Sequence, residues 1–309
     1  MITYKEIGSY KDYGRALEIE NGKIKAVITL DIGPRIIFFG FIDGQNIMCD
    51  NRKLLGGRTD ADYEKLFGAG KKWENLGGHR IWAAPEEWPL TYTPDDMPVS
   101  YKKTDSGAVF TCDASEKAGF EKCLEISMDD SSASMEVHMT LKNISEKARD
   151  CSIWALSVST TGGTLVLPMN NDDTVLLPNR IISVWPYTDI KDSRYEISDK
   201  YAVIQNTNKE KPLKLGFDLK RGNSYYFVGG EVFRKEFATF HDSEVYFDNG
   251  CSFETYNCDK FIEIETLGPI KTVAPKEQIE HTEKWYLYKS DNPDLSSDEG
   301  IDKAIKALQ

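Results

Sequence analysis

Residues 15–48 read RALEIENGKIKAVITLDIGPRIIFFGFIDGQNIM, and this stretch decides the fold class. Short runs rich in isoleucine, valine and phenylalanine follow one another, and each run ends at a turn sequence: Asn21-Gly22, Gly33-Pro34 and Asp43-Gly44. Asn-Gly readily supplies the two positive φ angles of a type I′ turn, which closes tight β-hairpins. The stretch therefore predicts consecutive antiparallel hairpins.

The same kind of pattern returns along most of the chain. In Met135–Leu141 the odd positions are apolar and the even positions are polar, a period of two that is typical of a half-buried strand. Roughly sixteen or more such strands, without a repeat of fixed period or βαβ alternation, predict an all-β protein built as a large antiparallel β-sandwich. We see no linker, so we expect residues 1–309 to form a single domain.

Helical patterns are short and few. The C-terminal tail predicts the clearest helix, with Ser296 or Ser297 as the cap, an acidic first turn and apolar residues at helical spacing up to Leu308. A shorter helix is expected within residues 59–67. The sandwich therefore ends in a short C-terminal helix.

Composition excludes several classes of partner. The chain is 40% hydrophobic and 28% charged, which is typical of a soluble globular protein. A net charge of −12 argues against nucleic acid or an anionic membrane as the main partner. The start has no signal-peptide pattern and no apolar run is long enough to span a bilayer, so we expect a cytoplasmic protein. Secretion stays open should residue 1 be the boundary of a longer chain.

The six cysteines are spread along the chain without a Cys-x-x-Cys pair. This spacing argues against a zinc ribbon or a redox dithiol and indicates buried free thiols. The Asn-Asp run in Met169–Thr174 offers oxygen ligands for Ca²⁺, but a polar turn is the better explanation of it. We expect no metal and no cofactor.

Residues 72–90, KWENLGGHRIWAAPEEWPL, hold three of the six tryptophans and one of the four histidines. The glycine pair Gly77-Gly78 allows a sharp turn or a close backbone approach. A titratable imidazole, a forked cation, carboxylates and flat indole faces are the parts of a sugar-binding cleft. The alternative is a Trp-rich core segment whose histidine and arginine are merely hydrogen-bonded. The candidates in this stretch are Asn75, His79, Arg80, Trp82 and Glu86.

A second informative stretch is residues 261–270, FIEIETLGPI. Glu263 and Glu265 are two apart, so on a strand they share one face, and burial there would raise at least one carboxyl pKa towards the range useful for proton transfer. On an exposed face they would be two solvated acids. Trp185, beside Pro186, is a further candidate for lining a cleft, and His241 is a further candidate for binding a substrate.

Three stretches together give the chain a family resemblance. Gly22–Asn46 holds two strands with a glycine-rich break between them, Leu76–Glu86 holds the Gly-Gly pair, and Glu263–Pro269 is followed by a final aromatic strand from His281 to Tyr288. In these features the sequence resembles the galactose mutarotase-like (aldose 1-epimerase) superfamily. The resemblance implies a supersandwich of antiparallel strands that binds a sugar in an open cleft.

The resemblance also implies catalytic roles. In mutarotases a glutamate on the late strand removes the anomeric hydroxyl proton and a histidine protonates the ring oxygen, so that the ring opens and closes on the other face. Carried over by position, the base is Glu265 or Glu263. The family's histidine lies on a middle strand, whose counterpart here is near Ser152–Ser157 with Trp154 in about its place. Either His79 has taken over the acid role or the mutarotase chemistry is lost.

Three functions remain open at this point. The first is an isomerase acting at the anomeric carbon by general acid and base catalysis, with Arg80 fixing hydroxyls or an anionic group. The second is a carbohydrate-binding protein without turnover, in which tryptophans stack on the sugar. The third is a polysaccharide hydrolase or lyase, with Glu86 or Glu87 facing Glu265 across a glycosidic bond. In each case the partner is a sugar or an oligosaccharide, and the sequence does not indicate an oligomeric state.

Overall fold

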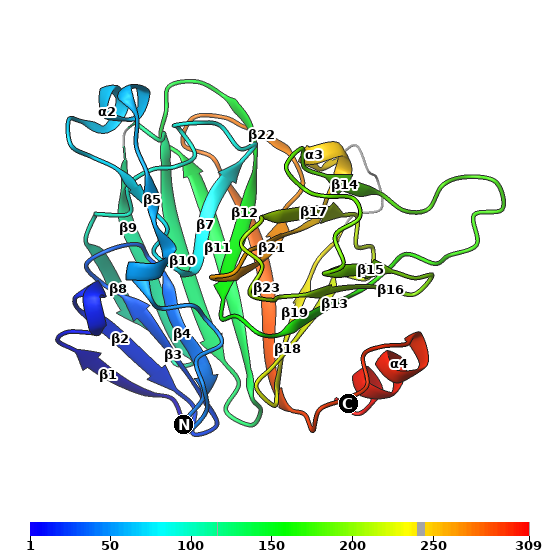
Figure 1. Cartoon of the computed structure of the whole chain (residues 1–309). Coiled ribbons are helices and arrows are strands. Elements are labelled where there is room, and N and C mark those ends of the chain that lie inside the picture. The colour runs from blue at the N-terminus through cyan, green and yellow to red at the C-terminus, as the bar shows by residue number, and fades with distance from the viewer. Residues whose placement is uncertain (116, 240–244, 309) are drawn as a thin grey trace.

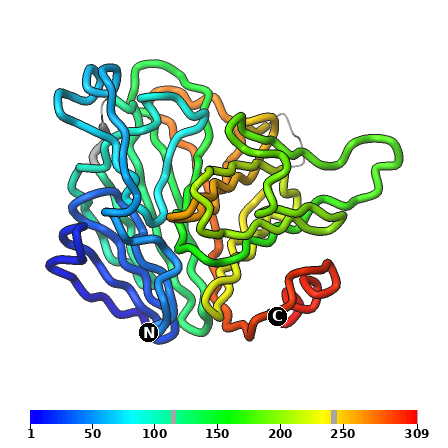
Figure 2. Tube along the Cα trace, viewed as in Figure 1, coloured from blue at the N-terminus to red at the C-terminus, as the bar shows by residue number. Residues whose placement is uncertain are grey.

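Two large antiparallel sheets lie face to face in the computed structural model of the protein (Figure 1), which describes residues 1–115, 117–239 and 245–308. Figure 2 shows the N-terminal strands in blue on one side of the molecule and the yellow and orange strands of the second half of the chain on the other. The two halves meet at the middle of the sheets. The predicted all-β sandwich is confirmed.

The first sheet has eleven strands that come from both halves of the chain. They are β1 (Thr3–Ile7), β2 (Ala16–Glu20), β3 (Ile24–Thr29), β4 (Ile36–Phe41), β7 (Gly78–Ala84), β12 (Arg149–Ser159), β14 (Ile182–Val184), β17 (Leu213–Phe217), β20 (Phe253–Asn257), β21 (Ile262–Leu267) and β22 (Lys271–Val273). Their order is β1-β2-β3-β4-β7-β12-β21-β20-β17-β14, and β22 pairs with β12. Strands far apart in sequence are therefore neighbours at the centre of the sheet.

The second sheet has ten strands. They are β8 (Val99–Lys103), β9 (Gly107–Ser115), β10 (Phe120–Met128), β11 (Ser134–Asn143), β13 (Thr164–Pro168), β15 (Tyr195–Ile197), β16 (Tyr201–Gln205), β18 (Asn223–Val228), β19 (Glu231–Phe237) and β23 (Gln278–Lys289). Their order is β15-β16-β13-β18-β19-β23-β11-β10-β9-β8. A separate small ladder joins β5 (Gly57–Arg58) to β6 (Trp73–Glu74).

The helices are short, as the sequence predicts. They are the 3₁₀ turn η1 (Lys11–Tyr13), α1 (Arg52–Leu55), α2 (Ala61–Phe67), α3 (Phe247–Gly250) and α4 (Asp298–Lys306). Both expected helices are confirmed with their caps, because Asp60 accepts a hydrogen bond from the Tyr63 amide and Ser297 accepts one from the Gly300 amide. Within the described ranges no helix is both long and apolar enough to cross a bilayer.

The core lies between the sheets and follows from strand alternation. Side chains at every second position of a strand point to the same face, so each sheet turns one apolar face inward. Phe39 of β4 packs edge-on against Trp285 of β23 with 5.1 Å between ring centroids, and it also packs against Phe233 of β19 at 5.7 Å. These aromatic contacts join the two sheets at the centre of the sandwich.

The first hairpin is confirmed, but its predicted turn type is wrong. β2 and β3 pair antiparallel, and only Gly22 of the two expected residues has a positive φ, at 84°. The Asn21 side chain instead accepts hydrogen bonds from the amides of Lys23 and Ile24, both at 2.9 Å. The Asn21 amide donates to the Ile24 carbonyl at 3.2 Å, so the two central residues are Gly22 and Lys23 rather than Asn21 and Gly22. A positive φ at the first of these positions alone is the pattern of a type II′ turn.

The glycine pair before β7 lets two strands meet. Gly77 and Gly78 have φ angles of 69° and 63°, and a Cβ on Gly78 would lie 2.5 Å from the Ile36 carbonyl oxygen. β4 and β7 pair at one described position, between Ile36 and His79, and Arg35 donates a hydrogen bond of 2.6 Å to the Gly77 carbonyl beside it. The expected close approach at Gly-Gly is therefore the place where the N-terminal strands join the centre of the sheet.

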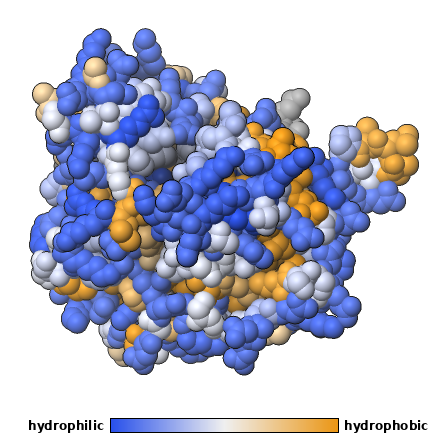
Figure 3. All heavy atoms as spheres, in the orientation of Figure 1, coloured by the Kyte–Doolittle hydropathy of each residue, from blue (hydrophilic) through white to orange (hydrophobic). Residues whose placement is uncertain are grey.

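A long loop projects from the body between β13 and β14, at the right of Figure 1. Its tip is apolar, and Figure 3 shows the projecting orange patch. Val175, Leu176 and Leu177 are 85%, 91% and 73% exposed, which is unusual for three consecutive aliphatic residues. The polar run Met169–Thr174 leads into this loop, and the loop takes no part in either sheet.

Replacing Gly78 by alanine tests the junction between β4 and β7. We expect the Gly78→Ala variant to lower the free energy of unfolding by at least about 2 kcal/mol more than Gly22→Ala, because both carry the backbone strain of a positive φ but only Gly78 also meets a backbone oxygen. A Cβ on Gly22 would meet nothing within 4 Å. Urea denaturation of the two variants measures the difference. Equal losses would show that the close approach at Gly78 is not what requires glycine.

Candidate functional site

The alternation of β7 separates the residues of the Gly-Gly-His-Arg segment. Arg80 and Trp82 lie on the outer face of the first sheet, where Trp82 belongs to a cluster with Trp154. His79 and Ile81 point the other way, into the sandwich. The segment therefore serves two different environments.

The outer face carries a cleft of about 420 Å³ over the central strands of the first sheet. Carboxylates, cations and aromatic rings line it together, which is the composition expected of a polar ligand site. The aromatic wall is continuous, because Trp82 packs edge-on against Trp154 at 5.6 Å and against Tyr92 at 4.8 Å. The lining includes Arg58, Trp73, Asn75, Arg80, Trp82, Glu86, Tyr92, Trp154, Tyr187, Glu210, Lys214, Tyr256, Asp259, Lys260, Phe261 and Glu263.

An ion pair on this face joins the two stretches that the sequence singled out. Arg80 Nη2 donates to Glu263 Oε1 at 3.0 Å, and the guanidinium stacks over the Trp82 ring at 4.3 Å. Arg80 Nε, Arg80 Nη1 and Trp82 Nε1 are buried and have no hydrogen-bond partner among the described residues. The pair therefore leaves three donors unsatisfied beside the cleft.

A second charged cluster lies beside the first, around Lys214 of β17. Lys214 Nζ is 2.7 Å from Glu254 Oε2 and 3.6 Å from Glu265 Oε2, and Trp154 Nε1 donates to the same Glu265 oxygen at 2.8 Å. The ammonium also lies 4.6 Å from the ring centroids of both Trp154 and Trp185. Two carboxylates and two indoles thus surround one buried cation.

Burial and mutual repulsion decide the charges of this cluster. Burial raises the pKa of Glu265 to about 7, against the opposing charge of Lys214. Burial raises the pKa of Glu254 well above its usual range. Burial alone would lower the pKa of Lys214. The charges of Glu265 and Glu254 outweigh the effect of burial and hold this pKa well above its ordinary value. Two carboxylates that share one cation keep a proton between them near neutral pH.

The expectation that Glu263 and Glu265 share a face is confirmed, since Arg80 and Lys214 contact them from the cleft side. Their accessibility differs. The Glu263 side chain is 11% exposed and lines the cleft, whereas Glu265 is fully buried behind Trp154. Only Glu263 is positioned to contact a ligand directly.

The other candidate ligand residues divide into three groups. Asn75 and Glu86 line the cleft, where Asn75 accepts a hydrogen bond from the Gly77 amide and Glu86 accepts one from the Tyr92 hydroxyl. Trp185 lies behind the cleft against Lys214. His241 lies outside the described residues.

The prediction that His79 is the acid of the cleft is wrong in its geometry. His79 is fully buried between the sheets, with Nδ1 2.9 Å from Ser157 Oγ and Nε2 3.3 Å from Met139 Sδ. Burial lowers its pKa to about 3. Neighbours on a strand face opposite ways, so His79 cannot share the outer face with Arg80.

A polar network lies next to His79 inside the core, and His79 packs edge-on against its Trp285 at 4.9 Å. Lys235 Nζ contacts Glu283 Oε1 at 2.9 Å, Trp285 Nε1 donates to Glu283 Oε2 at 2.6 Å, and Thr266 links the same carboxylate to His281 Nε2. Burial would raise the pKa of Glu283, but Lys235, the two histidines and Thr266 together outweigh burial, and the pKa falls to about 2. The network holds one ion pair and the neutral His281 within the sandwich.

Sequence reasoning missed Lys214 as a site residue. The signal was present, because Lys214 is a lone charge between apolar neighbours in the strand Leu213–Phe217, and a buried lysine needs partners. Tyr187 and Tyr256 were missed too, and single tyrosines in strand-rich sequence carry no comparable signal. Among the described side chains, no three His, Cys, Asp or Glu residues are arranged to hold a metal ion.

Comparison with solved structures identifies the fold of this chain, whereas comparison of sequences finds no match. The sequence matches no protein-family profile and no curated protein. A galactose mutarotase-like protein from Lactobacillus casei superposes with a TM-score of 0.53 at 14% identity, covering 88% of this chain and 100% of that one. The chain has the galactose mutarotase-like fold.

Two other solved structures extend this likeness. A provisionally named aldose 1-epimerase from Klebsiella pneumoniae gives a TM-score of 0.57 at 11% identity and covers 99% of this chain and 87% of its own. A TPR-domain containing protein from Parabacteroides distasonis gives 0.60 at 14% identity, with 92% of this chain but 48% of its own length covered. This chain thus spans about half of the Parabacteroides protein. All three structures share this chain's architecture at 11–14% sequence identity.

The buried histidines predict a loss of stability in acid. An unfolded histidine titrates near pH 6.5, whereas burial lowers the pKa of His79 to about 3 and that of His281 to about 4. The unfolded chain therefore binds more protons below pH 6.5. Each histidine removes up to about 1.4 kcal/mol of stability per pH unit as pH falls from about 6.5 towards its folded-state pKa.

Urea denaturation between pH 7.5 and 5 measures this slope. We expect His281→Gln, which removes one titrating group, to give a shallower slope than the wild type. His138→Gln is the matched control, because His138 is half-exposed on β11. The raised pKa of Glu265 adds stability as pH falls and opposes this slope, so the comparison between variant and wild type carries the test. Equal slopes for His281→Gln and the wild type would contradict a neutral buried histidine.

Proposed function

We propose that the protein binds a carbohydrate in the cleft over β7, β12 and β21. The observation that carries the proposal is the lining of the cleft, where the Arg80–Glu263 ion pair and the exposed polar residues Glu86 and Lys260 lie beside an aromatic wall. Charged and amide groups next to flat aromatic rings form a surface that is both polar and apolar.

A sugar satisfies both sides of this surface. Its hydroxyl oxygens accept from cations such as Arg58 and Lys260, and its hydroxyl hydrogens donate to Glu263, Glu86 or Asn75, all of which line the cleft. The apolar faces of a pyranose match flat aromatic rings. The galactose mutarotase-like fold supports the same class of ligand, because solved proteins with this fold carry names that refer to sugars.

Shortening an exposed aromatic residue of the cleft tests sugar binding. Tyr187 lines the cleft and is 43% exposed, so we expect Tyr187→Ala to fold and to bind sugar about tenfold more weakly through lost ring contact. Tryptophan fluorescence titrations with a panel of aldohexoses, hexose phosphates and short oligosaccharides measure affinity. Tyr286→Ala, on the other sheet, is the matched control. No saturable binding across the panel would overturn the proposal.

We propose as a second candidate that the cleft interconverts the anomers of the bound sugar. The observation that favours it is an accessible carboxylate and a charged donor on one wall, since Glu263 and Lys214 both line the cleft. Glu263 takes the proton of the anomeric hydroxyl, the bond between C1 and the ring oxygen breaks, and that oxygen receives a proton from Lys214. Rotation about the C1–C2 bond and the reverse steps give the other anomer.

Glu265 takes a supporting role in this scheme. It is buried behind Trp154 and contacts Lys214 at 3.6 Å, so its ionisation sets the charge next to the donor. Because burial raises its pKa to about 7, the charge of the cluster changes near neutral pH. The roles of the two glutamates then differ, with Glu263 at the substrate and Glu265 beneath Lys214.

Exchange spectroscopy of anomers by NMR tests the second candidate. We expect Glu263→Gln to lower the enzyme-dependent exchange rate by about 10²-fold or more, the usual contribution of a general base. Exposed Glu280 on β23 provides the control variant Glu280→Gln. The wild-type rate should change through about pH 7 as Glu265 ionises, and Glu265→Gln should remove that inflection.

The alternatives give different results in the same experiments. Saturable sugar binding with exchange no faster than in buffer would identify a binding protein without turnover. Release of reducing ends from a polysaccharide would identify a hydrolase instead. Either result leaves sugar binding intact and removes the anomeric chemistry.

A further inference from the structure

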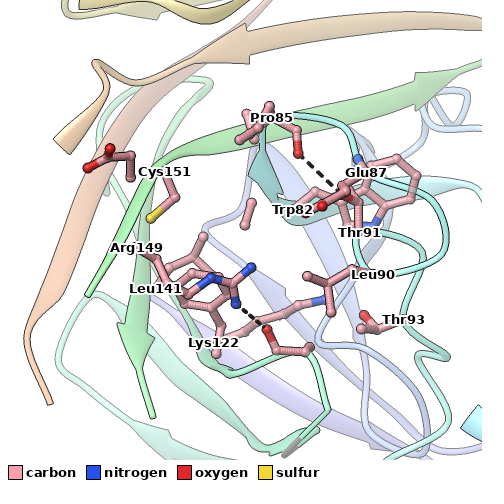
Figure 4. Close-up of a pocket in the computed structure, with 15 residues that line it drawn as sticks. Trp82, Pro85, Glu87, Leu90, Thr91, Thr93, Lys122, Leu141, Arg149 and Cys151 are labelled. Atoms are coloured by element: carbon pink, nitrogen blue, oxygen red, sulfur yellow. Dashed lines mark hydrogen bonds between the residues drawn. The ribbon is translucent and has the colours of Figure 1, made fainter. Parts of the chain in front are cut away.

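A second cavity, of about 250 Å³, lies between the ends of the two sheets (Figure 4). Its walls come from the ends of β7 and β12 in the first sheet and from β10 and β11 in the second, and the loop that follows β7 covers it. Trp82 separates it from the cleft and lines both hollows. The sugar cleft does not use this cavity.

Most of the lining is apolar. Ala84 and Pro85 come from the end of β7, Phe120 and Leu141 come from the second sheet, and Leu90 comes from the covering loop. An apolar hollow of about 150 Å³ is large enough to hold benzene. At about 250 Å³ this cavity has room for one ring and a small polar group, and it is smaller than the usual site of a drug-sized ligand.

Two cations face this apolar space. Figure 4 shows the Arg149 guanidinium beside Leu141 and Lys122, across the cavity from Leu90. Arg149 stacks over Phe120 at 4.5 Å, and its Nη1 donates to the Ala118 carbonyl at 2.7 Å. Among the described residues Arg149 makes no ion pair, so its remaining N–H groups are available to a ligand.

The neighbouring charges leave Arg149 as the main anchor. Lys122 already contacts Asp95 at 3.3 Å, so its charge is shared. Glu87 also lines the cavity but is exposed, where water and salt screen its charge. Asp150 accepts a hydrogen bond from Thr272 at 2.5 Å. Arg149 pairs with no carboxylate in the described part of the chain, and a planar guanidinium of this kind matches a ligand carboxylate in geometry and in charge.

We propose that this cavity binds a small carboxylic acid with an apolar body, such as a single aromatic ring bearing a carboxylate. The carboxylate pairs with Arg149, and the ring fills the space between Leu90, Phe120 and Leu141. Neutral sugars have too few apolar atoms for this lining, so the site differs in ligand class from the cleft.

Benzoate and its neutral counterpart benzamide are the probes. In titrations of the full chain by isothermal calorimetry we expect benzoate to bind with a Kd of roughly 1 mM or tighter and benzamide about tenfold more weakly, because only benzoate pairs with the guanidinium. Arg149→Gln should weaken benzoate about tenfold and leave benzamide unchanged, while Arg149→Lys should retain part of the preference. Arg221→Gln, which removes a remote exposed arginine, is the matched control.

A second variant and a location measurement keep the test independent of folding at residue 149. Leu90→Trp fills the cavity from the covering loop and should abolish benzoate binding. Nuclear Overhauser contacts from the benzoate ring should reach the methyl groups of Leu90 and Leu141. Equal affinity for the two probes, no effect of Arg149→Gln, or ring contacts to Tyr187 and Tyr256 of the cleft would overturn the proposal. None of these outcomes depends on whether the cleft binds sugar.

Discussion

The two-residue period of the central strands determines what the cleft contains. On β7, β12 and β21 one set of side chains faces the sandwich interior and the other faces the cleft, and the antiparallel register brings Leu156 opposite both Arg80 and Glu265. A residue cannot change faces without shifting the register and turning the whole apolar set outward. The packing of the core therefore determines which residues face the cleft, because each inward isoleucine places the next residue of its strand on the outer face.

This constraint explains why the polar residues of the molecule fall into two separate networks. The outer network joins Arg80 with Glu263 and Lys214 with Glu254 and Glu265. The inner network, around Glu283, lies on the other side of the same sheet. Buried ion pairs are weak evidence for stability, because desolvation offsets most of their attraction. The outer network borders a cleft, so its charges lie where a ligand can bind as well as where they contribute to packing.

Part of this arrangement could be predicted from the sequence. The hairpins, the sandwich, the capped helices and the shared face of Glu263 and Glu265 all follow from local patterns of period two or from turn and cap residues. The same period, applied to the Gly-Gly-His-Arg segment, would have separated His79 from Arg80. Arg80 and Glu263 are 183 positions apart, and local sequence patterns do not predict a contact over that distance. Lys214 lies at the site because β17 pairs with β20, and the sequence does not show that pairing.

The junction between β4 and β7 is a short ladder within a sheet that shares one core. The described ladder there has one register pair, whereas β7 and β12 pair over seven positions. The four-stranded N-terminal meander is therefore attached chiefly through side-chain packing, because Phe39 and the inward residues of β2 and β3 belong to the main core. Opening the meander breaks few ladder bonds at this junction but exposes that core, so its cost comes from lost packing rather than from lost backbone hydrogen bonds. Amide exchange in β1–β4 therefore reports on the same core that supports the strands beneath the cleft.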